Sequence, residues 1–247
     1  LDRFPPLRWL VSGVGRYLIP GSSRYKSRLR RMKRFAEPLN RGTVRRYLDW
    51  IRIFQEKHRR SYYSDDFMAQ LAGQRPEEFL QHAFDYFPRD PVSQVSLVDL
   101  VTYLPCDLMA KVDIATMAHS LECRQPMLDY RLVEFAAGLP VGLKYRRGRG
   151  KHLLQSAFGD LLPKEIWARP KMGFGVPLDY WFRHELRDLA HDVLLSDSAR
   201  CHQYVHRQGL QQMLDEHTAG RRDHSQRLWA VLMLETWMQR WSDAGAA

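Results

Sequence analysis

The chain has 247 residues, of which 45% are hydrophobic, and its 38 lysine and arginine residues outnumber 28 aspartate and glutamate residues, giving a formal net charge of +10. This length and apolar content suffice for a buried core and predict a single domain over residues 1–247 rather than a disordered polypeptide. No apolar run approaches the roughly 18 residues of a membrane span, so the sequence indicates no membrane partner.

Helical spacing of apolar residues dominates the chain, and strand-like alternation is hard to find, so we predict a mainly α fold. In the first part we expect one helix from Thr43 to the cationic residues 57–60, then helices beginning after Ser64 and at Pro76. Serine is a preferred N-cap, and proline is tolerated in the first helical turn. These residues therefore mark the starts of the helices.

The middle and the end of the chain carry further helical patterns. An apolar helix over residues 95–104 is expected to break at Pro105, and a second runs from Asp107 to Met117, with Asp107 and Lys111 on one face. Shorter helices are predicted over residues 132–136 and 151–158. A longer helix should begin at Asp179, and the last strong pattern covers residues 228–241.

Positive charge is concentrated in two segments. Residues 24–34 predict a basic amphipathic helix, which we interpret as a solvated surface helix rather than an RNA-binding or membrane-binding one. The second cluster lies in a glycine-containing loop, where contact with phosphate is more credible. Its members are Lys144, Arg146, Arg147, Arg149 and Lys151. For the three arginines we still favour a solvated loop.

The cysteine and histidine patterns indicate no metal site. Cys106, Cys123 and Cys201 are an odd number without C-x-x-C spacing, which argues against a disulfide framework and a zinc ribbon. Ten histidines include no H-x-x-x-H pair with a plausible third ligand. We therefore expect reduced thiols, ordinary polar histidines and a cytoplasmic location.

Many polar residues interrupt the apolar pattern between residues 107 and 129. Because buried charges need partners, we predict a paired network or a cleft. The network's members are Asp107, Lys111, Asp113, His119, Glu122, Arg124 and Asp129. For Glu122, Arg124 and Asp129 we favour an ion-pair scaffold, whereas Asp107 and Asp113 are candidates for supporting positions beside a reactive group.

Lys171 stands in a loop that cannot be helical, between Pro170 and Gly173. A rigid loop that presents one cation suits the stabilisation of phosphate charge. The pattern alone nevertheless favours an ordinary surface lysine.

The segments YLPCDLMAKVDIATMAHSLECRQPMLD, residues 103–129, and RPKMGFGVP, residues 169–177, resemble the asparagine synthetase family. The resemblance runs from about Asp99 to Pro177 and more weakly to the tryptophan-rich end. It implies the C-terminal helical portion of an ATP-pyrophosphatase domain of the adenine nucleotide alpha hydrolase-like type. There a carboxylate is activated as an acyl-adenylate and captured by ammonia.

The resemblance also implies roles for the basic residues. Lys171 would face the leaving pyrophosphate as a catalytic residue, and Lys151 matches a family lysine in the same region. Arg169, two residues before Lys171, would hold a phosphate or pin the loop. After Asp113 the common family pattern has arginine, alanine and serine, whereas residues 114–116 of this chain are Ile-Ala-Thr. The resemblance therefore does not specify which carboxylate is the substrate.

The family's SGG-x-DS loop and nucleophilic N-terminal cysteine are missing; the nearest sequence, residues 12–15, lacks the aspartate. We therefore expect the C-terminal piece of a longer glutamine-hydrolysing synthetase. Upstream glutaminase and nucleotide-binding segments would bind most of the ATP and Mg²⁺, with none bound tightly by this chain, which should be inactive alone. Its small-molecule substrates would be ATP and aspartate or a related carboxylate.

Two alternatives remain. A related adenylating amidotransferase would use a different carboxylate or acceptor, and a non-catalytic basic helical module would bind RNA or a protein. Nucleic acid is not favoured as a partner, and the oligomeric state is open, a homodimer included.

Overall fold

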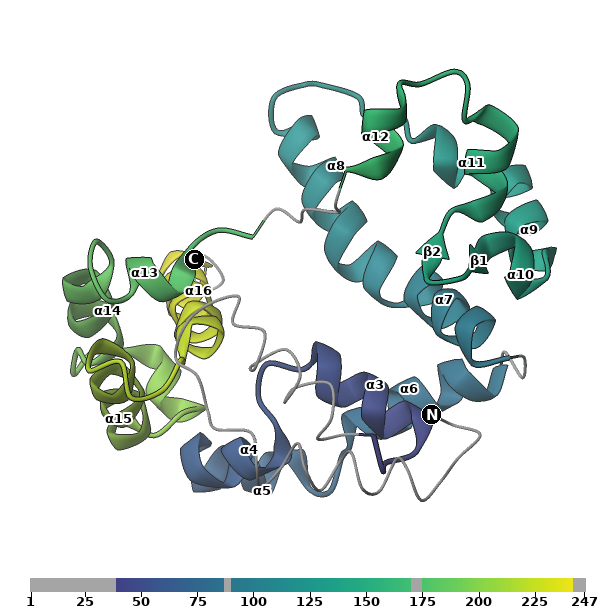
Figure 1. The fold of residues 1–247 in the computed structure, drawn as a ribbon. Helices are drawn as coiled ribbons and strands as arrows, with labels where there is room; N and C mark the ends of the chain where they lie inside the picture. The colour runs from purple at the N-terminus through teal and green to yellow at the C-terminus, as the bar shows by residue number, and fades with distance from the viewer. Residues whose placement is uncertain (1–38, 87–89, 170–174, 242–247) are drawn as a thin grey trace. The chain divides into compact units, whose positions relative to one another are not determined.

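The computed structural model describes residues 39–86, 90–169 and 175–241 of the chain. These residues are mainly helical, as the sequence predicts, and they form two compact units (Figure 1). Unit 1 combines residues up to Arg75 with those from Gly175 onward, and unit 2 comprises Pro76–Phe174.

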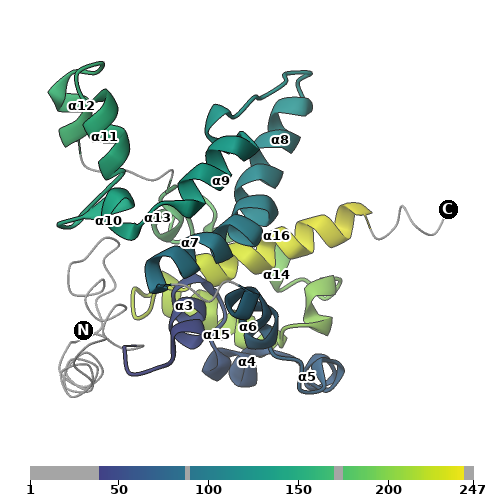
Figure 2. The ribbon, with the colours of Figure 1, turned by 90° about the vertical axis from the view of Figure 1, so that its right-hand side faces the viewer.

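Unit 1 is a helical bundle built from both ends of the described chain. Its elements are α3 (Thr43–Ile51), α4 (Glu56–Tyr62), α5 (Asp65–Leu71), α13 (Leu178–Trp181), α14 (Arg187–Leu194), the 3-10 helix η3 (Arg200–Gln203), α15 (Arg207–Thr218) and α16 (Ser225–Trp241). The long helix α16 contacts α13, α14, α15 and η3 and so forms the centre of the bundle (Figure 2).

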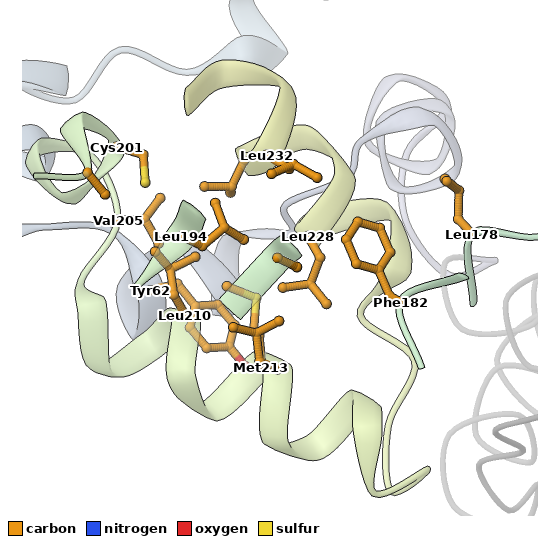
Figure 3. Packing of buried hydrophobic residues seen from close by; sticks show 14 residues of the cluster. Tyr62, Leu178, Phe182, Leu194, Cys201, Val205, Leu210, Met213, Leu228 and Leu232 are labelled. Atoms are coloured by element: carbon orange, nitrogen blue, oxygen red, sulfur yellow. The ribbon is translucent and has the colours of Figure 1, made fainter. Parts of the chain in front are cut away.

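The core of unit 1 lies where α14, α15 and α16 meet. Leu194, Leu210 and Leu228 are fully buried, one from each of these helices, and Phe182 closes the core from the turn after α13 (Figure 3). Each fully buried side chain of this size stabilises a fold by about 1.5–3 kcal/mol through removal of apolar area from water. Packing among distant segments therefore holds unit 1 together.

The end of α4 is fastened to the start of α15 by backbone hydrogen bonds. The Ser64 N–H donates to the Tyr204 carbonyl at 3.0 Å, and the His206 N–H donates to the Tyr62 carbonyl at 2.8 Å. Tyr62 is buried against Gly209, where an added Cβ would lie 2.9 Å from the tyrosine ring. The absence of a side chain at position 209 is what permits this close packing.

We expect Gly209→Ala to destabilise the protein by about 1–3 kcal/mol, because the new methyl group overpacks the Tyr62 contact. Gly142→Ala is the matched control, since position 142 also lies in a helix and a Cβ there meets nothing within 4 Å. It should be neutral or slightly stabilising. Denaturant unfolding of both variants checks this, and equal effects would contradict the packing argument.

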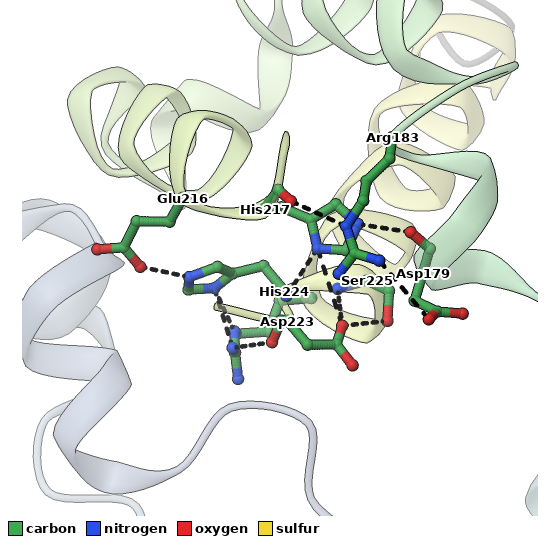
Figure 4. A network of polar contacts seen from close by, with 8 residues as sticks. Asp179, Arg183, Glu216, His217, Asp223, His224 and Ser225 are labelled. Carbon is green, nitrogen blue, oxygen red and sulfur yellow. Dashed lines mark hydrogen bonds and ion pairs between the residues drawn. The ribbon is translucent and has the colours of Figure 1, made fainter. Parts of the chain in front are cut away.

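A buried polar network joins the loop between α15 and α16 to α13 (Figure 4). The His217 ring accepts at Nδ1 from the His224 N–H at 3.1 Å, so its Nε2 carries the hydrogen and donates to the Asp179 carbonyl at 3.1 Å. The His224 Nδ1 accepts from Arg227 at 3.1 Å, so its Nε2 donates to Glu216 at 2.6 Å. These partners fix both rings in the neutral form.

Burial also favours the neutral rings. It lowers the pKa of His224 from 6.5 to about 4, against the opposing effect of the Glu216 carboxylate. The pKa of His217 is lowered by burial and then by the Arg183 guanidinium. Folding therefore opposes protonation of both side chains.

This linkage predicts that the free energy of unfolding decreases in acid. The His224 contribution is complete above pH 6.5 and is lost as the pH falls toward 4, where the folded protein must accept the proton that the unfolded chain already holds. The loss is on the order of 3 kcal/mol. Unfolding measured from pH 7 to pH 4 should show it, and His224→Gln, a neutral side chain, should flatten the curve; identical pH profiles would refute the assignment.

Unit 2 is a succession of short helices with one hairpin. Its elements are α6 (Pro76–Tyr86), α7 (Pro91–Val101), the π-helix η1 (Leu104–Met109), α8 (Ala110–Met117), the 3-10 helix η2 (Pro126–Leu128), α9 (Tyr130–Gly138), α10 (Val141–Lys144), β1 (Tyr145–Arg146), β2 (Arg149–Gly150), α11 (His152–Phe158) and α12 (Lys164–Ala168). The two strands pair antiparallel.

Unit 2 buries few side chains. From residue 103 to residue 169, no described residue is buried. Ile114, Met127 and Leu161 are 69%, 62% and 72% exposed, although apolar side chains of this size are usually inside a protein. The contacts described for this unit therefore leave a large apolar surface uncovered.

Several element boundaries differ from the sequence predictions. The first helix ends at Ile51 and a new one begins at Glu56, which lets Phe54 pack against Tyr63 at a ring separation of 5.5 Å. The expected break at Pro105 is a π-helical turn instead. The helix expected from Asp179 is divided into α13 and α14, and α15 was not predicted. The basic stretch 24–34 lies outside the described residues.

Candidate active site

The turn from α7 into α8 carries the first predicted site residues. Asp107 lies in η1 and Asp113 in the first turn of α8, and both are exposed. Asp107 and Lys111, which the sequence places on one face, form no ion pair with each other among the described residues. Asp107 instead accepts a hydrogen bond from Tyr103, an interaction that raises the pKa of the tyrosine. The acidic groups here face solvent.

Glu122, Arg124 and Asp129 form local pairs rather than the buried network that the sequence predicts. Arg124 Nε donates to Glu122 Oε1 at 2.9 Å, with both side chains largely exposed. Asp129 caps α9 by accepting from the Arg131 N–H at 3.0 Å, and the Arg131 side chain lowers the pKa of the aspartate. Glu122 thus pairs with Arg124 and Asp129 with Arg131 in this part of unit 2.

Lys151 occupies the N-cap of α11 with a positive φ of 57°, and its side chain is exposed. Its carbonyl accepts the first helical hydrogen bond, from Gln155 N–H at 3.0 Å. The predicted start of this helix is thus confirmed. The side chain extends from an irregular backbone position beside the β1–β2 hairpin.

Arg169 caps the C-terminus of α12 through its backbone N–H, which donates to the Glu165 carbonyl at 3.0 Å. Its side chain is exposed. Lys171, the predicted catalytic residue, lies outside the described residues. Apart from Glu122 and Arg124, the contacts between described residues join no two of the predicted site residues, so their roles remain predictions.

Metal binding finds no support in the parts of the chain that the structure describes. Among residues 39–86, 90–169 and 175–241, no group of three histidine, cysteine or acidic side chains could hold an ion. The described residues therefore do not fit a Mg²⁺ site, and no chemical step is assigned to a metal here. Within the same ranges, no helix has the length and apolar character needed to cross a membrane.

Sequence reasoning missed the buried network of unit 1. The signal was present as Glu216 and His217 before Gly220, with Asp223 and His224 after it, but ordinary turns contain the same residue types. The structure shows that these side chains satisfy one another inside the bundle. Their function is to hold the bundle, and the candidate active site stays in unit 2.

These observations define a mainly helical protein whose candidate site residues sit on turns and helix ends of one unit. Comparison with known sequences gives the family. Residues 12–239 match the family model described as asparagine synthase, and the chain belongs to that family. This single match extends over parts of both units.

Curated relatives agree with this assignment. The chain is similar to a putative glutamine-hydrolysing asparagine synthetase of Mycobacterium tuberculosis, at 40% identity over 149 residues, covering 60% of this chain and 22% of the relative. It is 32% identical over 146 residues to asparagine synthetase 1 of Bacillus subtilis, with 59% and 23% covered. The human asparagine synthetase is 27% identical over 197 residues, with 72% and 34% covered.

The matched part thus spans about a third or less of these relatives' length. No solved structure matches the chain.

The three cysteines differ in their surroundings. Cys106 is exposed, Cys123 is half-buried, and Cys201 is fully buried, where burial and then Glu235 raise its pKa to about 12. The thiolate is the reactive form of cysteine, so Cys201 should be inert in the folded protein.

We predict that a thiol reagent at pH 8 modifies Cys106 first in the folded chain and Cys201 only on unfolding. All three thiols should react in denaturant without a reductant. Mass spectrometry of the modified protein measures this order. Fewer than three reactive thiols in denaturant would show that a disulfide exists.

Proposed function

We propose that this chain forms the C-terminal helical part of a glutamine-hydrolysing asparagine synthetase domain of the ATP-pyrophosphatase type. The observation that carries the proposal is the family match over residues 12–239. In the proposed reaction, aspartate, ATP, glutamine and water give asparagine, AMP, pyrophosphate and glutamate. Both units would belong to one synthetase domain, with residues 1–247 folding as one part of it.

The proposed chemistry has two steps. A carboxylate oxygen of the substrate attacks the α-phosphorus of ATP, forming an acyl-adenylate and releasing pyrophosphate. Ammonia then attacks the acyl carbon and displaces AMP, giving the amide. The first step concentrates negative charge on the departing phosphates, which fixed cations stabilise.

The basic residues of unit 2 would supply these cations. Lys151 is exposed at the N-cap of α11, and Arg169 is exposed at the end of α12, immediately before the segment that contains Lys171. We propose that Lys171 contacts the leaving pyrophosphate, with Lys151 and Arg169 as further phosphate ligands. Asp107 and Asp113 would support the site, and the pairs made by Glu122 and Asp129 would hold the turns around it.

Upstream segments would complete the domain. The SGG-x-DS pattern does not occur in the sequence of the described residues, and the relatives are several times longer than the matched part. The uncovered apolar side chains of unit 2, such as Ile114 and Leu161, support the packing of further protein against it. We propose that glutaminase and nucleotide-binding segments cover this surface and bind most of the ATP and Mg²⁺.

One observation favours a related amidotransferase that activates a different carboxylate. After Asp113 the chain has Ile-Ala-Thr, and Ile114 is 69% exposed at a position where the family pattern has an arginine. An apolar side chain cannot hold a carboxylate as a guanidinium does. An assay of amide formation with aspartate and other carboxylic acids separates these two functions.

The test of the proposal is Lys171→Ala in the full-length enzyme. Loss of one preorganised electrostatic group typically reduces kcat by on the order of a hundredfold to a thousandfold. Pyrophosphate release and amide synthesis should fall, whereas glutamine hydrolysis and stability should be nearly unchanged. Lys171→Arg should rescue only in part, because a planar guanidinium replaces a compact ammonium.

Lys164→Ala is the matched control, since Lys164 is an exposed lysine at the start of α12 in the same unit. It should keep full activity. Near-normal kcat for amide formation in Lys171→Ala would make Lys171 an ordinary surface residue and overturn its catalytic assignment.

A further inference from the structure

The hairpin that precedes α11 concentrates positive charge without a negative partner. Arg146, Arg147, Arg149 and Lys151 lie within six residues, and all four side chains are exposed. Among the described residues, none of these side chains takes part in an ion pair or a hydrogen bond. Arg124 and Arg131, which belong to the same unit, are instead paired with neighbouring carboxylates.

The strand register adds a repulsive contact. β1 and β2 pair antiparallel with Arg146 directly opposite Arg149. Residues in this relation have Cβ atoms about 5 Å apart on the same face, and like charges there destabilise a hairpin. A two-stranded ribbon of this size has little other stabilisation to offset the repulsion.

The backbone adds strain at two of the four cations. Arg147 has a φ of 48° and is followed by Gly148 at 82°, the positive pair that a two-residue hairpin turn requires. Lys151 has a φ of 57°. Glycine and asparagine adopt this region readily, whereas long side chains are disfavoured there. The sequence thus places arginine and lysine where the backbone favours other residues.

We propose that this basic hairpin, residues 145–151, is a binding site for a compact polyphosphate anion, with pyrophosphate as the smallest member of the class. A multiply charged anion between Arg146 and Arg149 would turn their repulsion into attraction. Each guanidinium can donate two parallel hydrogen bonds to phosphate oxygens. Arg147 and Lys151 lie in the same short segment and add two further cations.

The footprint favours a compact anion over nucleic acid. Proteins that bind a nucleic-acid backbone typically spread some 6–10 phosphate contacts along it, whereas these four cations lie in one turn and its flanks. The inference deepens the proposed function and rests on it only for the source of the anion, the pyrophosphate released on adenylation. It assigns binding to Arg146, Arg147 and Arg149, which the sequence alone favours as solvated.

The test is binding of inorganic pyrophosphate to the 247-residue chain, measured by calorimetry and by the shift in unfolding temperature. Arg146→Gln combined with Arg149→Gln should weaken binding at least about tenfold, since two charge-assisted contacts are lost. The control is Arg45→Gln combined with Arg187→Gln, which removes the same charge from two exposed arginines of unit 1. It should bind pyrophosphate as the unaltered chain does.

Stability without ligand provides a second readout. The hairpin variant should unfold at a higher temperature than the unaltered chain in the absence of pyrophosphate, because the facing like charges are gone, and at a lower temperature with saturating pyrophosphate. Arg146→Lys combined with Arg149→Lys keeps the charge and should retain part of the binding. An ordinary solvated surface would not reverse the order of the two unfolding temperatures when pyrophosphate is added.

Three results would overturn the inference. They are equal weakening in the hairpin and control variants, unchanged binding in the hairpin variant, and binding of a single-stranded oligonucleotide that pyrophosphate does not displace. The Lys171→Ala assay on the full-length enzyme is independent of all three. If only the pyrophosphate-binding experiment on the hairpin contradicts its expectation, the proposed function still stands. If only the Lys171→Ala assay contradicts its expectation, the anion site still stands.

Discussion

Close packing of Tyr62 on the backbone of Gly209 joins the two ends of the described chain. The tyrosine comes from α4 and the glycine from α15, and backbone hydrogen bonds from Ser64 and His206 fasten the same junction. The buried leucines of α14, α15 and α16 surround it. Because contacts between residues so far apart in sequence are costly to form, the bundle depends on all of them together.

The polar network of unit 1 follows from this packing. His217 and His224 lie beneath the same helices, so every polar atom of the two rings needs a partner inside the protein. Asp179, Glu216 and Arg227 supply these partners from the surrounding elements. The network joins the turn after α15 to α13, and therefore links the end of the chain to the segment that follows residue 174.

Unit 2 lacks the packing between distant segments that holds unit 1 together. Its described turns are held by interactions between residues close in sequence, such as Glu122 with Arg124 and Asp129 with Arg131. Exposed ion pairs of this kind contribute little to stability. The unit therefore needs additional packing to be rigid, and rigidity is what a site that holds phosphates requires. This difference supports the proposal that further protein segments complete the site.

Local signals in the sequence predicted local structure well. Ser64 caps α5, Pro76 begins α6 and α11 starts directly after Lys151, because a cap or a proline acts within one turn of itself. The sequence did not predict α15, whose buried face is defined by its packing against α4, α14 and α16. For Glu122 and Arg124 it favoured an ion-pair scaffold without specifying the exposure of these side chains, since charge pairing is local and burial depends on the other elements.

The candidate site was accessible to sequence reasoning only through its family resemblance. Lys171 and Arg169 have no distinguishing spacing, and the contacts between described residues do not join Arg169 to Lys151 or to the acidic residues. The basic hairpin was visible as a charge cluster. To predict that Arg146 lies opposite Arg149, the strand register must be known. Four strand residues without apolar alternation do not specify that register.

The π-helical turn η1 has a consequence for how the segment around it can vary. A π-turn contains one residue more than an α-helical turn, so it acts as an insertion accommodated within a helix. Removing one residue between Leu104 and Met109 would restore regular winding without breaking the rod from α7 to α8. The residues after the turn would keep nearly their present faces. If the turn rewound as a regular α-helix without losing a residue, everything after it would rotate by about 100° around the helix axis relative to α7. Asp113 would then leave its present face, so the winding of this turn sets the direction in which the acidic residues of α8 point.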